Sequence, residues 1–317
     1  MFSYRHAFHA GNHADALKHL TLIGALQHLM RKPGPLTLID THAGAGRYRL
    51  DGEMAATSGE ADAGVLRLLK ALPDAASGLL ADYRALLAAF NPQWPTLTVY
   101  PGSPLVLHHH MTQPERLDGA VSRDRLHLYE LHPTDSRTLL TLVAGLSSRR
   151  RIHAERADGF AALRALLPPP ADGGGSRRAL ALIDPSYEIK SDYTKVEQAV
   201  QDALRCFATG VYLVWYPIIG RAQAHQLPRR LKALAGQAGR NWLHATLNIG
   251  QARARPGAAE PGKGSALRAS GMFVINPPYP LAAGLRAALP HVLAALAQGP
   301  GQDWQVETST PAADTVR

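Results

Sequence analysis

Apolar positions along the chain follow two different periods, which predict alternating strands and helices. Short apolar runs of strand length fall at residues 36–40, 126–130, 152–154, 179–184, 211–216, 243–249 and 272–276. Apolar residues recur at helical spacing at 105–111, 136–146, 160–166, 193–207, 223–235 and 285–298. This alternation predicts an α/β fold with a doubly wound, mostly parallel sheet, in which ligands bind at the carboxyl ends of the strands.

The first hundred residues add two features to this alternation. Asn12 is placed to cap a helix whose apolar positions run from Leu17 to Leu26, so a polar N-terminal motif at 1–20 precedes or begins that helix. Residues 50–100 are rich in alanine and leucine and predict a helical subdomain inserted into a single domain of residues 1–317. Loops are expected at 168–176 and 251–264, the second one basic, and a mobile tail at 299–317.

Composition narrows the class of protein. With 46% hydrophobic residues and no apolar run long enough to span a bilayer, we expect a soluble globular protein. Arg5 and His6 interrupt the region where a signal peptide would be apolar, which favours a cytoplasmic protein. The single cysteine, Cys206, excludes an internal disulfide, and we interpret it as a small buried residue.

The charge is unevenly distributed. The formal net charge is +9, and residues 203–302 contain eleven Lys or Arg and one acid, Glu260. Such a basic stretch indicates a polyanionic partner such as RNA or DNA, although general solubility explains it about equally well.

Polar residues at the ends of four predicted strands suggest a nucleotide-like cofactor. The first strand runs into a small-residue turn that contains Gly44 and Gly46, where backbone can approach a ligand closely. Glu130 ends the second strand, where a carboxylate can accept both hydroxyls of a ribose. Asp158 and Gly159 follow the third, where an acid can accept from an adenine amine. This order suits S-adenosylmethionine.

The turn after the fourth strand, Asp184-Pro-Ser-Tyr187, indicates chemistry on an exocyclic amine. The lone pair of adenine N6 is delocalised into the ring until its hydrogens are held by acceptors. The Asp184 carboxylate and the Pro185 carbonyl can accept one hydrogen each, and Tyr187 is expected to stack on the base. Ser186 stands where a second proline is common. Because the acceptor carbonyl belongs to Pro185, this position mainly stiffens the turn, and the effect of Ser186 on catalysis stays open. No metal is required, and alone Asp184 would be an ordinary strand-end acid.

Two other patterns were weighed against this site. Asn276-Pro-Pro-Tyr279 matches the amino-methyltransferase motif more closely, but it follows the last predicted strand, at the far edge of the sheet from the glycine turn. We interpret it as a structural turn. The histidines at 6, 9 and 13 and at 108–110 lack the Cys or carboxylate spacing of a metal site, so no metal is expected.

The residues quoted so far, together with the opening segment Tyr4-Arg-His-Ala-Phe-His-Ala-Gly-Asn-His-Ala-Asp-Ala-Leu-Lys-His19, resemble the RlmJ family of 23S ribosomal RNA adenine-N6 methyltransferases. The resemblance spans the whole chain and implies a class I, Rossmann-like, S-adenosylmethionine-dependent methyltransferase. It implies a cofactor site at His19, His42, Gly44, Gly46, Ser103, Glu130, Asp158, Gly159 and Asp184. It places Tyr4, His6 and Lys18 against the RNA, and implies a target in domain V of protein-free or early assembling 23S rRNA.

Three alternatives remain open at this point. The same turn would serve a DNA adenine-N6 or cytosine-N4 methyltransferase, and a protein that does not bind the cofactor would be an rRNA-binding assembly factor. A nicotinamide-dependent oxidoreductase leaves Asp184 and Pro185 unexplained. We expect a monomer that contacts neither membrane nor metal.

Overall fold

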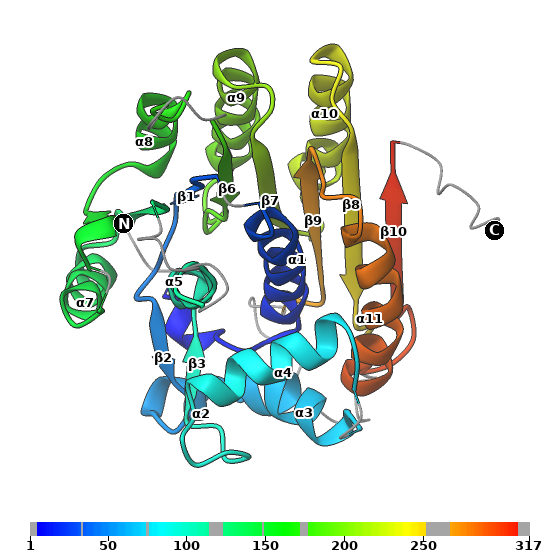
Figure 1. Ribbon diagram of the computed structural model, residues 1–317. Coiled ribbons are helices and arrows are strands. Elements are labelled where there is room, and N and C mark those ends of the chain that lie inside the picture. Colours follow the sequence, from blue (N-terminus) through cyan, green and yellow to red (C-terminus); the bar gives the residue numbers. More distant parts are fainter. Residues whose placement is uncertain are drawn as a thin grey trace.

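The computed structural model describes residues 5–32, 34–73, 76–113, 123–147, 149–171, 177–251 and 267–309. Within these residues an eight-stranded sheet of order β10-β8-β9-β7-β6-β1-β4-β5 runs through the molecule (Figure 1). Its strands are β1 (Thr37–Asp40), β4 (Arg125–Tyr129), β5 (Ile152–Glu155), β6 (Ala179–Ile183), β7 (Val211–Pro217), β8 (Trp242–Asn248), β9 (Ala269–Ile275) and β10 (Asp303–Thr308). Neighbours from β5 to β7 are parallel, whereas β9 is antiparallel to β7 and β8, and β10 to β8. The predicted doubly wound, mostly parallel sheet is confirmed.

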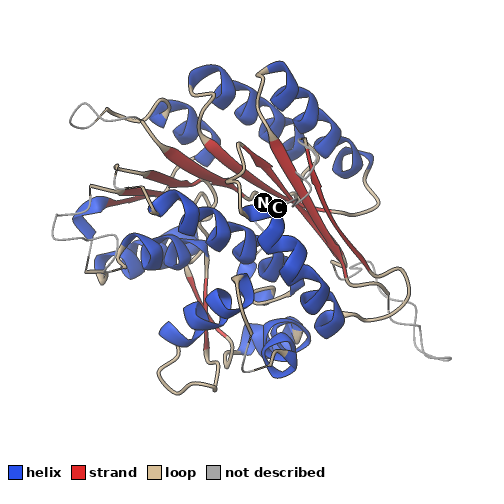
Figure 2. Cartoon of the chain, turned by 45° about the vertical axis from the view of Figure 1, so that its right-hand side comes forward, coloured by secondary structure: helices blue, strands red, loops and turns tan. Residues whose placement is uncertain are grey.

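Helices cover both faces of this sheet (Figure 2). One face carries α8 (Gly159–Leu166), α9 (Ser191–Cys206) and α10 (Ala222–Gln237), and the other carries α1 (His13–Met30), α5 (Ser103–Met111), α7 (Pro133–Ala144) and α11 (Leu281–Leu296). Successive side chains of a strand point to opposite faces, so Leu182 of β6 enters one core and Ile183 the other. Burial on both faces explains the unbroken apolar runs in the sequence.

Helix α1 is buried over most of its length. It contacts α4 (Leu79–Ala89), α5, α11 and β9. The side chain of Asn12 caps the helix by accepting from Ala14 N at 2.9 Å and Asp15 N at 3.0 Å. The polar residues Lys18 and His19 therefore lie inside the protein. In the part of the chain that the structure describes, neither α1 nor any other helix has the length and apolar character needed to cross a membrane.

The residues between β1 and α5 form a helical insertion on a short ribbon. It contains α2 (Glu53–Ser58), a π-helical turn (Asp62–Leu66), α3 (Arg67–Ala71) and α4 (Leu79–Ala89), between the antiparallel strands β2 (Arg47–Arg49) and β3 (Val99–Pro101). Val65, Leu68 and Tyr83 of the insertion are buried in the same apolar cluster as α1 and α11. The insertion thus shares the main core.

Two expectations about the chain are wrong. The predicted tail from Gly299 contains β10, because Trp304 and Val306 pack on the core while the backbone pairs with β8; residues 310–317 lie outside the described residues. Cys206 is exposed rather than buried, since it is the last residue of α9 and the apolar face of that helix lies elsewhere. Of the predicted basic loop, residues 252–264 also lie outside the described part.

The Asn276-Pro-Pro-Tyr279 turn lies at the opposite end of the sheet from Asp184. The prediction that Asn276 ends an edge strand is wrong, because β9 lies between β7 and β8. Since β9 is antiparallel and Ile275 pairs with Tyr212, Asn276 lies near the start of β7. Its amide donates to the carbonyls of Ala208 at 2.8 Å and Gly210 at 2.7 Å, which ties the turn to the chain before β7.

Replacing Asn276 should therefore lower stability. Asn276→Ala loses both hydrogen bonds and places alanine at φ 54°, so we expect the free energy of unfolding in urea to fall by about 1–3 kcal/mol. Asn276→Gly relieves the backbone strain and should lose less. Tyr279→Ala is the control, because that side chain is 88% exposed. Equal stability of all three variants would contradict a structural role for Asn276.

Candidate active site

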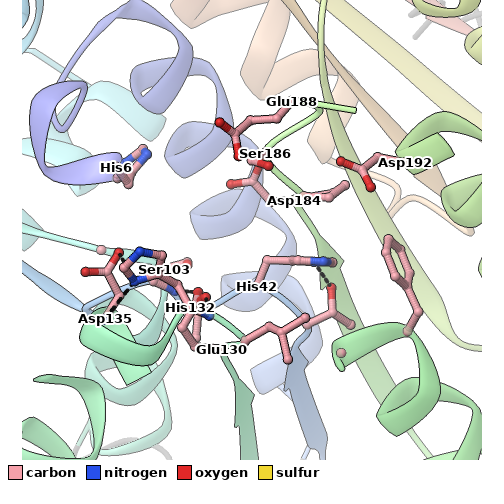
Figure 3. Close-up of a pocket in the computed structure, with 18 of the residues that line it drawn as sticks. His6, His42, Ser103, Glu130, His132, Asp135, Asp184, Ser186, Glu188 and Asp192 are labelled. Atoms are coloured by element: carbon pink, nitrogen blue, oxygen red, sulfur yellow. Dashed lines mark hydrogen bonds and ion pairs between the residues drawn. The ribbon is translucent and has the colours of Figure 1, made fainter. Parts of the chain in front are cut away.

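A cavity of about 420 Å³ opens at the carboxyl ends of β1, β4 and β6 (Figure 3). Turns from these strands, the start of α8, and residues of the N-terminal segment and α1 form its walls. The predicted site residues that line it are His6, Lys18, His19, His42, Gly44, Ser103, Glu130, Asp158, Gly159, Asp184 and Pro185. The volume is sufficient for a nucleoside with a further substituent.

Glu130 supports the glycine turn from the adjacent strand. Its Oε2 accepts from Gly44 N at 2.7 Å, and its Oε1 accepts from His132 N, also at 2.7 Å. Burial raises the pKa of Glu130, while these two N–H groups act in the opposite direction. Each carboxylate oxygen still has a lone pair, so the side chain can accept from ligand hydroxyls.

The turn that carries Asp158 and Gly159 is pressed against the end of β1. The Asp158 carboxylate caps α8 by accepting from Phe160 N at 2.9 Å and Ala161 N at 3.3 Å. A Cβ atom at position 159 would lie 1.8 Å from the carbonyl oxygen of Thr41, so only glycine fits there. The close approach brings Asp158 into the same cavity as the glycine turn.

Two histidines line the cavity in the neutral form. Burial lowers the pKa of His42 to about 4 and the pKa of His19 to about 3. The ring of His42 packs edge-on against Phe160, with 4.8 Å between ring centroids. Both rings therefore offer hydrogen-bonding groups without charge.

The carboxylate of Asp184 is held by a buried ammonium. Lys18 Nζ lies 2.7 Å from Asp184 Oδ2 and 2.9 Å from Asp15 Oδ1, and its side chain is 7% exposed. Burial would lower the pKa of Lys18, but the two carboxylates raise it well above its ordinary value. Asp15 Oδ2 also contacts His6 Nε2 at 3.0 Å and accepts from Gly11 N at 2.8 Å. Asp15 thus connects the N-terminal segment to the catalytic candidate.

Asp40, the last residue of β1, is fully buried beside the cavity. Its Oδ1 accepts from His42 N at 3.3 Å, and its Oδ2 has no hydrogen-bond partner among the described residues. Burial raises the pKa of Asp40 to about 7; the Ser103 side chain acts in the opposite direction, and the charge of Asp184 in the same direction as burial. Two acids at this position suit a ligand that carries positive charge.

Tyr187 does not line the cavity, so the prediction that it stacks on a substrate base is wrong for this structure. Its φ of 54° turns the side chain into the core, where the ring lies 4.6 Å from Tyr193 and the hydroxyl donates to Trp215 O at 2.7 Å. The side chain is buried, at 3% exposure. Its position stiffens the Asp-Pro-Ser-Tyr turn from behind.

The other predicted site residues to place are Gly46, Lys18 and Tyr4. Gly46 supports the cavity wall from outside, because it packs on Leu142 and its carbonyl accepts from Gly102 N. Lys18 lines the cavity, where its ammonium contacts the carboxylates of Asp15 and Asp184, and a contact of this side chain with RNA stays a prediction. Tyr4 lies outside the described residues.

Sequence reasoning missed part of the cavity and the groups behind it. Lining residues that were not predicted are Thr41, Ala43, Tyr48, Gly102, Leu131, His132, Asp135, Phe160, Ser186, Glu188, Ile189, Asp192 and Lys195. Leu131 and Phe160 directly follow predicted site residues, so their neighbours in the sequence were a usable signal. The sequence gives no such signal for Asp15 and Tyr48, because their contacts arise only in the folded chain.

Comparison with known proteins identifies the family. The family described as "Ribosomal RNA large subunit methyltransferase D, RlmJ" matches residues 33–309. The chain is 36% identical to "Ribosomal RNA large subunit methyltransferase J" of Haemophilus influenzae, over 98% of this chain and 100% of that protein. It is 39% identical to the protein of that name from Escherichia coli, over 92% of each. A solved structure from Legionella pneumophila has a TM-score of 0.75 and 30% identity, covering 94% of this chain and 98% of that one.

A doubly wound sheet with a glycine turn, an acid after β4 and an Asp-Pro turn after β6 defines a class I, Rossmann-like methyltransferase. The chain belongs to the RlmJ family of ribosomal RNA large subunit methyltransferases. S-adenosylmethionine is the methyl donor that membership of this family implies. The cavity fits it, because Glu130, Asp158 and Asp184 line the cavity and would suit its hydroxyl, amine and cationic groups.

Gly159→Ala tests the close approach between α8 and β1. The added Cβ would meet the Thr41 backbone, so the turn must move outwards, and we expect affinity for S-adenosylhomocysteine to fall by about tenfold or more in calorimetry. In the control Gly145→Ala, the added Cβ would come no closer than 3.5 Å to a neighbouring atom. Wild-type affinity in the Gly159→Ala variant would show that the turn is looser than described.

Asp40→Asn tests the buried acid through the pH dependence of stability. The pKa of Asp40 is near 7 in the folded state, against an ordinary value of 3.8, so Asp40 binds a proton more tightly in the folded protein. The free energy of unfolding of the wild type should therefore fall as pH rises from about 4 to about 7, because the folded state loses this bound proton. Asparagine cannot titrate. The melting temperature of the variant relative to wild type should therefore be higher at about pH 8 than at about pH 5 without ligand. A difference that is the same at both pH values would refute the raised pKa.

Proposed function

We propose that the protein transfers a methyl group from S-adenosylmethionine to the exocyclic N6 of an adenine in 23S rRNA. The observation that carries the proposal is the Asp184 carboxylate, which lines the cavity beside Pro185 with its Oδ2 held by Lys18. The similar proteins of H. influenzae and E. coli are named as large-subunit rRNA methyltransferases, which supports rRNA as the acceptor.

The cofactor would be held by residues from the turns after β1, β4 and β5 and from helices α1 and α5. Glu130 would accept from the ribose hydroxyls and Asp158 from the adenine amine, while Gly44 and Gly159 allow backbone to approach. His19, His42 and Ser103 complete the site. When bound, S-adenosylmethionine supplies an electrophilic methyl group on a cationic sulfur.

The turn after β6 orients the acceptor amine. Because Lys18 occupies Asp184 Oδ2, the free Oδ1 is available to accept one hydrogen of the amine, and the Pro185 carbonyl can accept the other. These two acceptors direct the nitrogen lone pair towards the methyl group and take up positive charge as it develops. The lost amine proton then leaves through Asp184 to water. Holding both reactants in line provides much of the rate.

Access to this cavity requires an unpaired base. The N6 atom of a base inside a helix cannot reach Asp184, so the acceptor must lie in a loop or be flipped out. His6 lines the cavity on the side of the N-terminal segment, and we propose that it faces the RNA; the family resemblance implies the same role for Tyr4. The excess of basic residues in 203–302 would attract phosphates. The family resemblance supports a target in domain V of protein-free or early assembling RNA, and with it a reaction in the cytoplasm.

Asp184 variants test acceptor and catalytic site together. We expect wild-type protein to transfer labelled methyl to protein-free 23S rRNA as N6-methyladenosine, and Asp184→Asn and Asp184→Ala to lower kcat by about 10²–10³-fold or more. Asn276→Ala, at the other end of the sheet, is the matched control and should retain activity. Label found in 16S rRNA or DNA instead would show that 23S rRNA is not the acceptor. Full activity of Asp184→Ala would refute the role of Asp184 in the reaction.

A further inference from the structure

A chain of three buried side chains runs from the helical insertion to the cavity. Tyr83 of α4 and Tyr100 of β3 have their hydroxyl oxygens 3.0 Å apart, and the Tyr100 hydroxyl lies 2.8 Å from His19 Nδ1. Tyr83 and Tyr100 are 0% exposed and His19 is 1% exposed. The rings of Tyr100 and His19 are stacked with 13° between their planes. No role in the reaction follows for either tyrosine from the site described above.

Counting protons along this chain determines the tautomer of His19. Each tyrosine has one hydroxyl proton, and no hydrogen bond of the Tyr83 hydroxyl other than that to Tyr100 is found among the described residues. If Tyr83 donates to Tyr100 and Tyr100 donates to His19 Nδ1, both protons are bonded. The neutral imidazole adds a third proton, so in either tautomer one donor stays unpaired among the described residues. With the proton on Nδ1 this donor would be the Tyr83 hydroxyl inside the core. With the proton on Nε2 it belongs to a side chain that lines the cavity, where a ligand can accept from it. Nδ1 is therefore the acceptor, and the proton lies on Nε2.

His19 Nε2 is a buried donor that requires a partner. The atom is inaccessible to solvent, has no hydrogen-bond partner among the described residues, and belongs to a side chain that lines the cavity. Burial keeps the imidazole neutral, so Nε2–H acts as a hydrogen-bond donor rather than as a cation. A buried donor without an acceptor is unfavourable, which indicates that a ligand supplies the acceptor.

The chemistry of the cavity indicates which part of the ligand accepts. Glu130, Asp158 and Asp184 are acids, which suit the hydroxyl, amine and cationic groups of the cofactor but repel its carboxylate. The ammonium of Lys18 already contacts two carboxylates of the protein. Lys195 also lines the cavity, but its ammonium lies 3.8 Å from Asp192 Oδ1. His19 Nε2 offers a carboxylate a neutral N–H donor.

We propose that Tyr100, supported by Tyr83, is a positioning residue that fixes His19 as an Nε2–H donor for the carboxylate of the methionyl group of S-adenosylmethionine. The proposal rests on the proposed function for the identity of the ligand. It assigns a task to the helical insertion: α4 supplies the tyrosine that orders the hydrogen-bond chain at its far end. The insertion thereby acts on cofactor binding without touching the cofactor.

The tautomer is measured directly by ¹⁵N NMR of protein labelled at histidine, with His19→Asn used to assign the signals. Wild-type protein should show His19 protonated at Nε2 and not at Nδ1, and Tyr100→Phe should show a mixture of tautomers, because the acceptor role of Nδ1 is lost. Protonation of His19 at Nδ1 in the wild type would overturn the proposal. This readout needs neither cofactor nor activity.

Binding of two probes tests the ligand group. S-adenosylhomocysteine carries the amino-acid carboxylate and 5′-methylthioadenosine lacks it. Tyr100→Phe should weaken binding of the first by about tenfold and leave the second within about twofold. Tyr83→Phe should weaken the first by about threefold, and it tests the chain even if Tyr100→Phe does not fold. Tyr212→Phe is the matched control, since Tyr212 is equally buried and donates to Ala203 O and Phe207 O, on the other face of the sheet.

The outcomes separate this proposal from the proposed function. Equal weakening of both probes would mean a general structural role for Tyr100 and would overturn the proposal. Unchanged binding of S-adenosylhomocysteine by Tyr100→Phe, with methyl transfer to rRNA by the wild type, would also overturn it while the proposed function stands. If the wild type binds neither probe, the ligand assignment fails together with the proposed function.

Discussion

The buried ion cluster of Lys18, Asp15 and Asp184 is the interaction on which the site depends. It joins α1 to the turn after β6, and through His6 it includes the N-terminal segment. Removing one member would leave an uncompensated buried charge, which typically costs about 3–5 kcal/mol. Such a cluster is weak evidence for stability, but it fixes the direction of the Asp184 carboxylate. A carboxylate with one oxygen held has the other oriented before substrate arrives.

Much of the fold could be predicted, because parallel strands buried on both faces leave unbroken apolar runs between amphipathic helices. The seven predicted strands are present, and the elements that were missed have a physical reason. β2 and β3 have three residues each, too few to show a period, and β10 alternates at an edge with Asp303 and Glu307 among its residues. The place of β9 in the sheet depends on its antiparallel pairing with both neighbours, which no local pattern encodes.

The site could be predicted where its residues end strands. Parallel topology brings the carboxyl ends of β1, β4 and β6 together, so Gly44, Glu130 and Asp184 meet in one cavity. Residues whose roles depend on contacts between distant parts of the chain were not predictable in this way. Tyr187 follows a correct motif, yet its positive φ directs the ring inwards. The Tyr83–Tyr100–His19 chain likewise joins three elements that share no local signature.

The separation of Lys18 and Asp184 by 166 residues has a consequence for how the protein is made. During translation α1 leaves the ribosome early. Until β6 has been synthesised, the ammonium of Lys18 has Asp15 as its nearby counter-charge. Long-range contacts of this kind form late and together. A nascent chain that ends before β6 therefore lacks both the acceptor turn and the partner that orders it. Fragments from synthesis that stops before residue 184 of the 317 therefore lack the carboxylate on which the proposed reaction depends.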